Sequence, residues 1–353
     1  MIRAWNRFWF APTSANPLAA LRILFGLIVL LHLALLVPDV EAWFTDAGRL
    51  QGAEARQLAG PAWSSRFPVP MRWSPLQNYR TVAAVQGVLA ATAVVAILFL
   101  LGWRTRIMGV LLYAGLMTIH HANILTTSGA DVLLMILSFY LMLSPCGAAY
   151  SLDSRRQAKT YGGAYSALVA PWTQRLIAIQ ISVVYLMTAF LKAQGKNWSS
   201  GTALHFILNN GEARRFTLGL TSYPAILNAM TFGTMFLEVA LGLLLWVRAA
   251  RPLMIILGLA LHGGITLTIN IPIFGELMAA CYLSYLSAQE WDSISRCLDP
   301  RRLWRKAAAQ TTIPGRVDVS HAGNSAGPYS ETRQRKNSPE MLVPTGKRQR
   351  TLR

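Results

Sequence analysis

Residues 185–201, which read YLMTAFLKAQGKNWSSG, place positive charge at the end of an apolar run. Lys192 closes the run, and Lys196 and the aromatic anchor Trp198 follow it. A lysine near the end of a membrane span can extend its ammonium group to water, and it then has no chemical role. Burial instead favours the neutral amine, which is a base. Both interpretations of Lys192 are open on the residues alone.

Three carboxylate or imidazole side chains share this apolar setting. Glu238 and His262 lie within apolar runs, and Asp131 begins another. A charged group at the centre of a bilayer costs about 2.5–3.5 kcal/mol, so such groups face the interior of a helix bundle and pair with one another. We therefore predict that Lys192, His262, Glu238 and Asp131 line a polar, outward-facing cavity. Lys192 is the candidate base.

Histidines near the ends of two other apolar runs are weaker candidates. His32 and one of the adjacent residues His120 and His121 are more simply explained by an interfacial position or by a hydrogen bond to a backbone carbonyl. The adjacent pair cannot both face one cavity, because neighbouring residues on a helix point in different directions.

The composition is that of a membrane protein. Of 353 residues, 53% are hydrophobic and 14% are charged, whereas a soluble domain carries about 25% charged residues. Apolar runs of this length predict membrane-spanning helices. We predict an all-α fold, a polytopic bundle of about eight transmembrane helices in one domain over residues 17–292. The expected spans are 17–38, 82–101, 107–126, 131–145, 174–192, 226–247, 252–270 and 273–286.

The net charge of +18 is concentrated in loops and in the C-terminal tail. Lysine and arginine are enriched in cytoplasmic loops, and the loops after the second, fourth and sixth spans carry them. This pattern predicts an inner (plasma) membrane protein with both termini in the cytoplasm. Residues 1–16 should lie at the membrane interface, and residues 293–353 should form a basic, disordered tail.

Membrane lipids explain this charge better than a nucleic acid does, because basic residues also favour anionic headgroups. We therefore expect no nucleic-acid partner. The three cysteines, Cys146, Cys281 and Cys297, show no metal-ligand spacing. The sequence thus indicates neither a metal site nor a disulfide framework.

Several stretches together resemble one known family. They are the segment 185–201, the run LEVALGLLLWVRAARP, the run LALHGGITLTINIPIFGELMAACYLSYLSAQEW, and the short element Ser151-Leu152-Asp153. Taken together, and in their order along the chain, they resemble the HTTM family, the horizontally transferred transmembrane domain proteins related to the membrane part of vitamin K-dependent gamma-carboxylase. The resemblance covers about residues 17–292.

The resemblance implies a role for Lys192 as the base that deprotonates a quinone-type cofactor, and it places His262 and Glu238 at polar positions of the same bundle. Where the carboxylase has an assisting histidine, this chain has Ala130 and Asp131. The carboxylase also has a large outer-face domain, which this chain does not resemble, so glutamate carboxylation is not expected. The leading hypothesis is a membrane protein that binds a quinone-like or other lipophilic small molecule. The alternative is a non-enzymatic transporter or accessory membrane subunit.

Overall fold

The computed structural model describes residues 1–60, 62–64, 67–70, 72–161, 167–211, 214–216 and 219–298. This part of the chain is built mainly of helices. Its α-helices are α1 Ile2–Phe10, α2 Asn16–Leu36, α3 Val40–Phe44, α4 Gly52–Leu58, α5 Val82–Leu101, α6 Thr105–Ala122, α7 Gly129–Leu143, α8 Leu152–Thr160, α9 Trp172–Gln194, α10 Lys196–Ser199, α11 Ala203–Asn209, α12 Pro224–Leu244, α13 Arg251–Thr268, α14 Phe274–Cys281 and α15 Ala288–Leu298.

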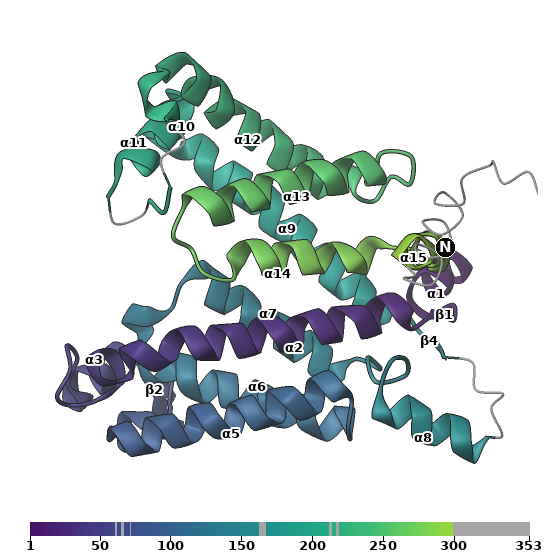
Figure 1. The fold of residues 1–353 in the computed structure, drawn as a ribbon, viewed down its shortest axis with the longest axis horizontal. Coiled ribbons are helices and arrows are strands. Elements are labelled where there is room, and N and C mark those ends of the chain that lie inside the picture. Colours follow the sequence, from purple (N-terminus) through teal and green to yellow (C-terminus); the bar gives the residue numbers. More distant parts are fainter. Residues whose placement is uncertain are drawn as a thin grey trace, which may run out of the picture. The chain divides into compact units, whose positions relative to one another are not determined.

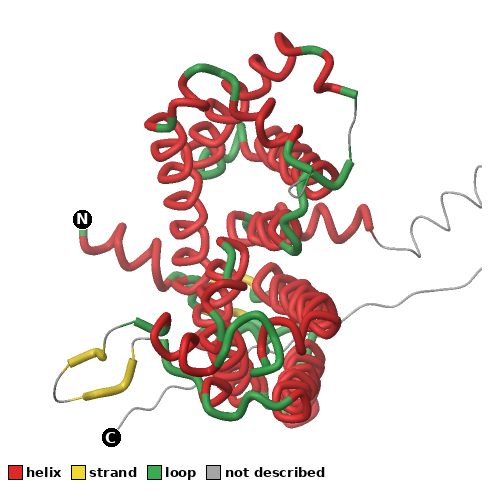
Figure 2. Tube along the Cα trace, turned by 90° about the vertical axis from the view of Figure 1, so that its left-hand side faces the viewer, coloured by secondary structure: helices red, strands yellow, loops and turns green. Residues whose placement is uncertain are grey.

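Short 3-10 turns and strands connect these helices. Strand β1 (Thr13–Ser14) pairs antiparallel with β4 (Leu168–Val169), and β2 (Ala62–Ser64) pairs antiparallel with β3 (Phe67–Pro70). These strands are the yellow segments of Figure 2. The 3-10 turns are η1 Val37–Asp39, η2 Pro75–Gln77, η3 Ile124–Thr126, η4 Leu220–Ser222 and η5 Tyr282–Tyr285.

Five of the described helices, α2, α5, α9, α12 and α13, are long and apolar enough to cross a membrane. The expected span 82–101 coincides with α5, and the other four lie within two or three residues of expected spans. Helix α7 is apolar but shorter, and α14 ends at Cys281, where η5 begins. The chain is therefore a multi-pass membrane protein, whereas the count of eight spans and the side of each terminus remain predictions.

The helices pack against one another in neighbouring pairs (Figure 1). Most of their buried apolar side chains form one large cluster. Helix α5 contacts both α2 and α6, α6 contacts α7, and α9 contacts α12. Many large apolar side chains of the spanning helices nevertheless face outward, among them Val94, Phe190, Phe236 and Ile256. Exposed apolar faces of this extent are unfavourable in water and favourable against lipid.

Gly102 allows the tight connection that follows α5. Its φ of +71° is a left-handed conformation that favours glycine. A Cβ added there would lie 2.3 Å from Cβ of Ser151. The start of helix α8 therefore packs directly on the end of α5, which no residue with a side chain would permit without a shift.

The buried guanidinium of Arg22 joins α2 to the end of α5 and to the segment that follows α7. Its Nη1 donates to the carbonyl of Cys146 at 2.9 Å, and its Nη2 donates to that of Tyr150 at 2.6 Å. Longer contacts reach the carbonyls of Leu100 and Ala149. Arg22 has no exposed surface, so backbone carbonyls rather than water bind the two terminal nitrogens of this charged group.

The Ser-Leu-Asp element has a capping role. The carboxylate of Asp153 accepts hydrogen bonds from the backbone N–H groups of Arg104 and Thr105, at 2.9 and 2.7 Å, and from the Thr105 hydroxyl at 2.7 Å. It thereby satisfies free N–H groups at the start of α6. Ser151 caps the start of α8 by accepting from the Ser154 N–H at 2.8 Å.

Both ends of the described chain carry amphipathic helices. No residue of α1 is buried, and Trp5 and Phe10 are exposed. This exposure is compatible with the predicted interfacial segment 1–16, which stays a prediction. At the other end, α15 continues to Leu298, so the first residues of the predicted tail are helical. The rest of the tail, including its predicted disorder, lies outside the described residues.

Candidate functional site

One face of α9 carries three polar side chains toward its neighbours. Tyr185, Thr188 and Lys192 are spaced three and four residues apart, which places them on the same side of a helix. Helix α9 is held against α12, and its C-terminal end continues through Gly195 into α10. The face therefore presents its polar groups to α12 and α13 rather than to lipid.

Lys192 forms an ion pair with Glu238 of α12. Its Nζ contacts Oε1 of Glu238, and the other carboxylate oxygen lies 3.5 Å from the Thr188 hydroxyl. The ammonium group also lies 4.6 Å from the ring centroid of Trp198, within cation–π range. The Glu238 side chain is 8% exposed and that of Lys192 is 23% exposed. Lys192 is thus paired and only partly accessible, which differs from a lysine that simply extends to water.

His262 of α13 joins the same face of α9 through a hydroxyl. Its Nε2 lies 2.7 Å from Oη of Tyr185, which in turn lies 2.5 Å from Oη of Tyr282. The other ring nitrogen, Nδ1, is buried and has no hydrogen-bond partner among the described residues. The rings of His262 and Phe274 meet edge to face, with centroids 5.6 Å apart. An imidazole with one bonded and one free nitrogen can accept or pass on a proton.

Gly258 makes room for this hydroxyl network. A Cβ at residue 258 would lie 2.0 Å from Oη of Tyr282, far inside van der Waals contact. Gly258 is one helical turn before His262 on the same face of α13. The absence of a side chain at Gly258 therefore lets the phenol of Tyr282 reach Tyr185.

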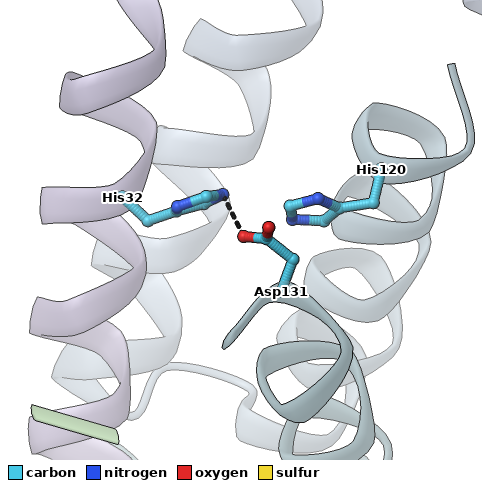
Figure 3. A group of neighbouring side chains, drawn as sticks. All are labelled: His32, His120 and Asp131. Carbon is cyan, nitrogen blue, oxygen red and sulfur yellow. Dashed lines mark ion pairs between the residues drawn. The ribbon is translucent and has the colours of Figure 1, made fainter. Parts of the chain in front are cut away.

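Asp131, the fourth predicted site residue, belongs to a different cluster. Its Oδ1 lies 3.6 Å from Nε2 of His32 on α2, and the rings of His32 and His120 stack with centroids 5.0 Å apart. Figure 3 shows the three side chains turned toward one another. The structure thus brings together Lys192 and Glu238, and it places Asp131 with the two histidines.

Sequence reasoning did not single out two tyrosines, and it treated two buried histidines as weaker candidates. Tyr185 and Tyr282 are uncharged members of apolar runs, so composition gave no reason to single them out. His32 and His120 are both buried, whereas the adjacent His121 is only half-buried. The argument that adjacent residues cannot share one cavity could have selected one of the pair, but nothing in the sequence indicates which one.

Together these groups form a set of proton donors and acceptors inside an apolar helix bundle. A carboxylate, an amine, an imidazole and two phenols lie on or beside one face of α9. Such groups can exchange protons with a bound molecule, and apolar surroundings favour lipophilic molecules. The fold and this interior polar set define an integral, multi-pass membrane protein.

Comparison with known families identifies the family to which the chain belongs. A model of the HTTM domain matches residues 55–291, and the chain belongs to this family. The predicted resemblance to HTTM proteins is therefore confirmed. Among curated proteins and among solved structures, no match was found.

Proposed function

We propose that this HTTM protein binds a quinone-like, lipophilic small molecule and that Lys192 is its proton acceptor. The observation that carries the proposal is the contact of Lys192 with Glu238, made on the same face of α9 on which Tyr185 binds His262 of α13. Lys192 can accept a proton from a ligand only after giving up its own. The carboxylate of Glu238 is in direct contact with Nζ and can take it.

The predicted position in the cell is part of the same proposal. Basic loops favour the plasma (inner) membrane with both termini in the cytoplasm. In this orientation the end of α9 that carries Lys192 lies toward the outer side. The cavity that would admit the molecule from that side is likewise proposed, and its support is the convergence of buried polar groups in an apolar bundle.

A binding and proton-uptake experiment tests the proposal. We would measure equilibrium binding of a short-chain naphthoquinol to purified protein in detergent, together with proton exchange in weak buffer. Lys192→Met keeps the length of the side chain without the amine. Lys196→Met is the matched control, because Lys196 is exposed and lies on α10 immediately after α9.

We expect the wild type and Lys196→Met to bind and exchange protons alike, and Lys192→Met to lose proton exchange and to bind at least tenfold more weakly. No binding by the wild type would remove the quinone hypothesis and leave the transporter or accessory subunit as the alternative. Equal proton exchange in Lys192→Met would remove Lys192 as the acceptor.

A further inference from the structure

Three potential metal ligands from three helices meet at one end of the bundle. His32 lies in the second half of α2, His120 near the end of α6, and Asp131 in the first turn of α7. One ligand atom from each lies within 4.8 Å of the other two, and all three side chains are buried. The convergence depends on the packing of α6 against α7 and of α2 against α5, so it is a property of the fold.

The ring nitrogens lack the partners that buried polar atoms need. Nε2 of His32 and Nε2 of His120 are both inaccessible to solvent and form no hydrogen bond within the described chain. The carboxylate oxygen nearest to His32 is 3.6 Å away, which is too long for a hydrogen bond. A buried nitrogen without a partner costs free energy, so such a site calls for an explanation.

The carboxylate of Asp131 is already oriented. Its Oδ2 accepts hydrogen bonds from the backbone N–H of Ser128 at 2.7 Å and from the Ser128 hydroxyl at 2.8 Å. The first of these bonds is part of a capping box at the start of α7. Both bonds leave Oδ1 turned toward His32. Hydrogen bonds of this kind orient the ligands of known metal sites.

We propose that His32, His120 and Asp131 form a site for one divalent first-row transition metal ion of the zinc type. Two imidazoles and a carboxylate suit Zn²⁺ or a similar ion better than Mg²⁺ or Ca²⁺, which prefer oxygen ligands. Ligands bound to zinc at about 2.0–2.1 Å lie roughly 3.3 Å apart in a tetrahedron. Small side-chain rotations bring atoms that lie within 4.8 Å to that separation.

A three-ligand site leaves a fourth position open for water or another molecule. Neighbouring polar contacts keep this end of the bundle in place: Asn123 donates to the carbonyl of Trp43 at 2.7 Å, and Gln77 donates to that of His121 at 2.9 Å. These contacts tie the segment after α2 to the end of α6. The proposed ion is distinct from the Lys192–Glu238 pair and does not depend on the function proposed for it.

Metal titration of the purified protein tests the site. Protein in detergent is stripped with a chelator and titrated with Co²⁺, whose visible absorption reports tetrahedral coordination, and then with Zn²⁺ in competition. The variants are His120→Gln and His32→Gln, which keep polar side chains of similar size. The matched control is His121→Gln, at the adjacent residue, which is half-buried and is not one of the three clustered ligands.

We expect one Co²⁺ per chain in the wild type and in His121→Gln, displaced by Zn²⁺, and at least tenfold weaker binding in both other variants. Thermal unfolding without metal shows whether each variant is folded, and addition of Zn²⁺ should raise the midpoint only where the site is intact. Absence of a stoichiometric ion in the folded wild type would overturn the proposal. So would an equal loss of binding in His121→Gln.

Discussion

The ion pair between Lys192 and Glu238 allows a quantitative test of how the bundle holds charge. We consider Lys192→Met, Glu238→Gln and the double variant. Lys192→Met leaves a carboxylate whose side chain is 8% exposed and whose remaining neighbour, the Thr188 hydroxyl, is 3.5 Å away. Removal of one partner from a buried pair costs about 3–5 kcal/mol. Because the site is not fully closed, we expect Lys192→Met to lower the free energy of unfolding by about 3 kcal/mol.

Substitution of the other partner of the pair should reduce the free energy of unfolding by less. Glu238→Gln leaves an ammonium group that is 23% exposed and rests against the ring of Trp198. A lysine in this position can turn its charge to the surface while its stem stays buried, so we expect about 1–2 kcal/mol. The double variant leaves no unpaired charge, and it should be about as stable as Glu238→Gln alone.

Unfolding of the purified protein by a denaturing detergent measures these differences, and the double-mutant cycle isolates the interaction between the pair. Because the double variant should be about as stable as Glu238→Gln, we expect the two single effects to be non-additive by about 3 kcal/mol, the whole effect of Lys192→Met. Additivity within about 0.5 kcal/mol would show that the two groups do not interact and would refute the reasoning. A larger effect for Glu238→Gln than for Lys192→Met would contradict the assigned difference in burial.

Three further predictions concern other parts of the fold. Gly258→Ala should destabilise the protein by about 1–3 kcal/mol because its methyl group displaces Tyr282; Gly263→Ala on the same helix, where a Cβ meets nothing within 4 Å, is the control in the same unfolding assay. The pKa of Glu290 outside the spans is lowered, since burial, which would raise it, is outweighed by hydrogen bonds from Ser287 and by the charge of Arg251. Stability should therefore fall as the pH drops below about 4.5, the ordinary pKa of this carboxyl, and Glu290→Gln should flatten this part of the profile. Asp153→Ala should cost about 1–2 kcal/mol in thermal unfolding, because it removes the cap of α6; an unchanged midpoint would contradict that role.

The spanning helices could be predicted because a long apolar run carries its own signal. Residues 82–101 show this best. The apolar run there coincides with α5, and residues that favour helix ends flank it: Thr81 caps its start and Gly102 ends it. The last predicted span, 273–286, covers α14 and the 3-10 turn η5 that follows it. Helix α14 stops at Cys281, and the following turn points Tyr282 and Tyr285 into the bundle, where both hydroxyls are bonded. That change of conformation follows from tertiary contacts, which periodicity does not report.

The candidate site could be predicted only in part, for a related reason. Hydropathy shows that an ionisable residue lies within an apolar run, and on this basis Lys192 and Glu238 were predicted to line one cavity. It does not state how each helix is rotated or which helices are neighbours. The grouping of His32 with Asp131, and of Tyr185 with His262, depends on both. No spacing along the chain contains that information, because the partners come from separate helices.

The backbone carbonyls that bind the Arg22 guanidinium have a consequence for how the chain enters the membrane. The acceptors at Leu100, Cys146 and Tyr150 lie 78, 124 and 128 residues further along the chain. Synthesis proceeds from the N-terminus, so α2 is complete long before any of them exists. During that interval the guanidinium needs water or lipid headgroups. Arg22 can therefore complete its hydrogen bonds, and α2 can reach its final position, only after Tyr150 has been synthesised. The residue thus imposes an order on the assembly of these helices.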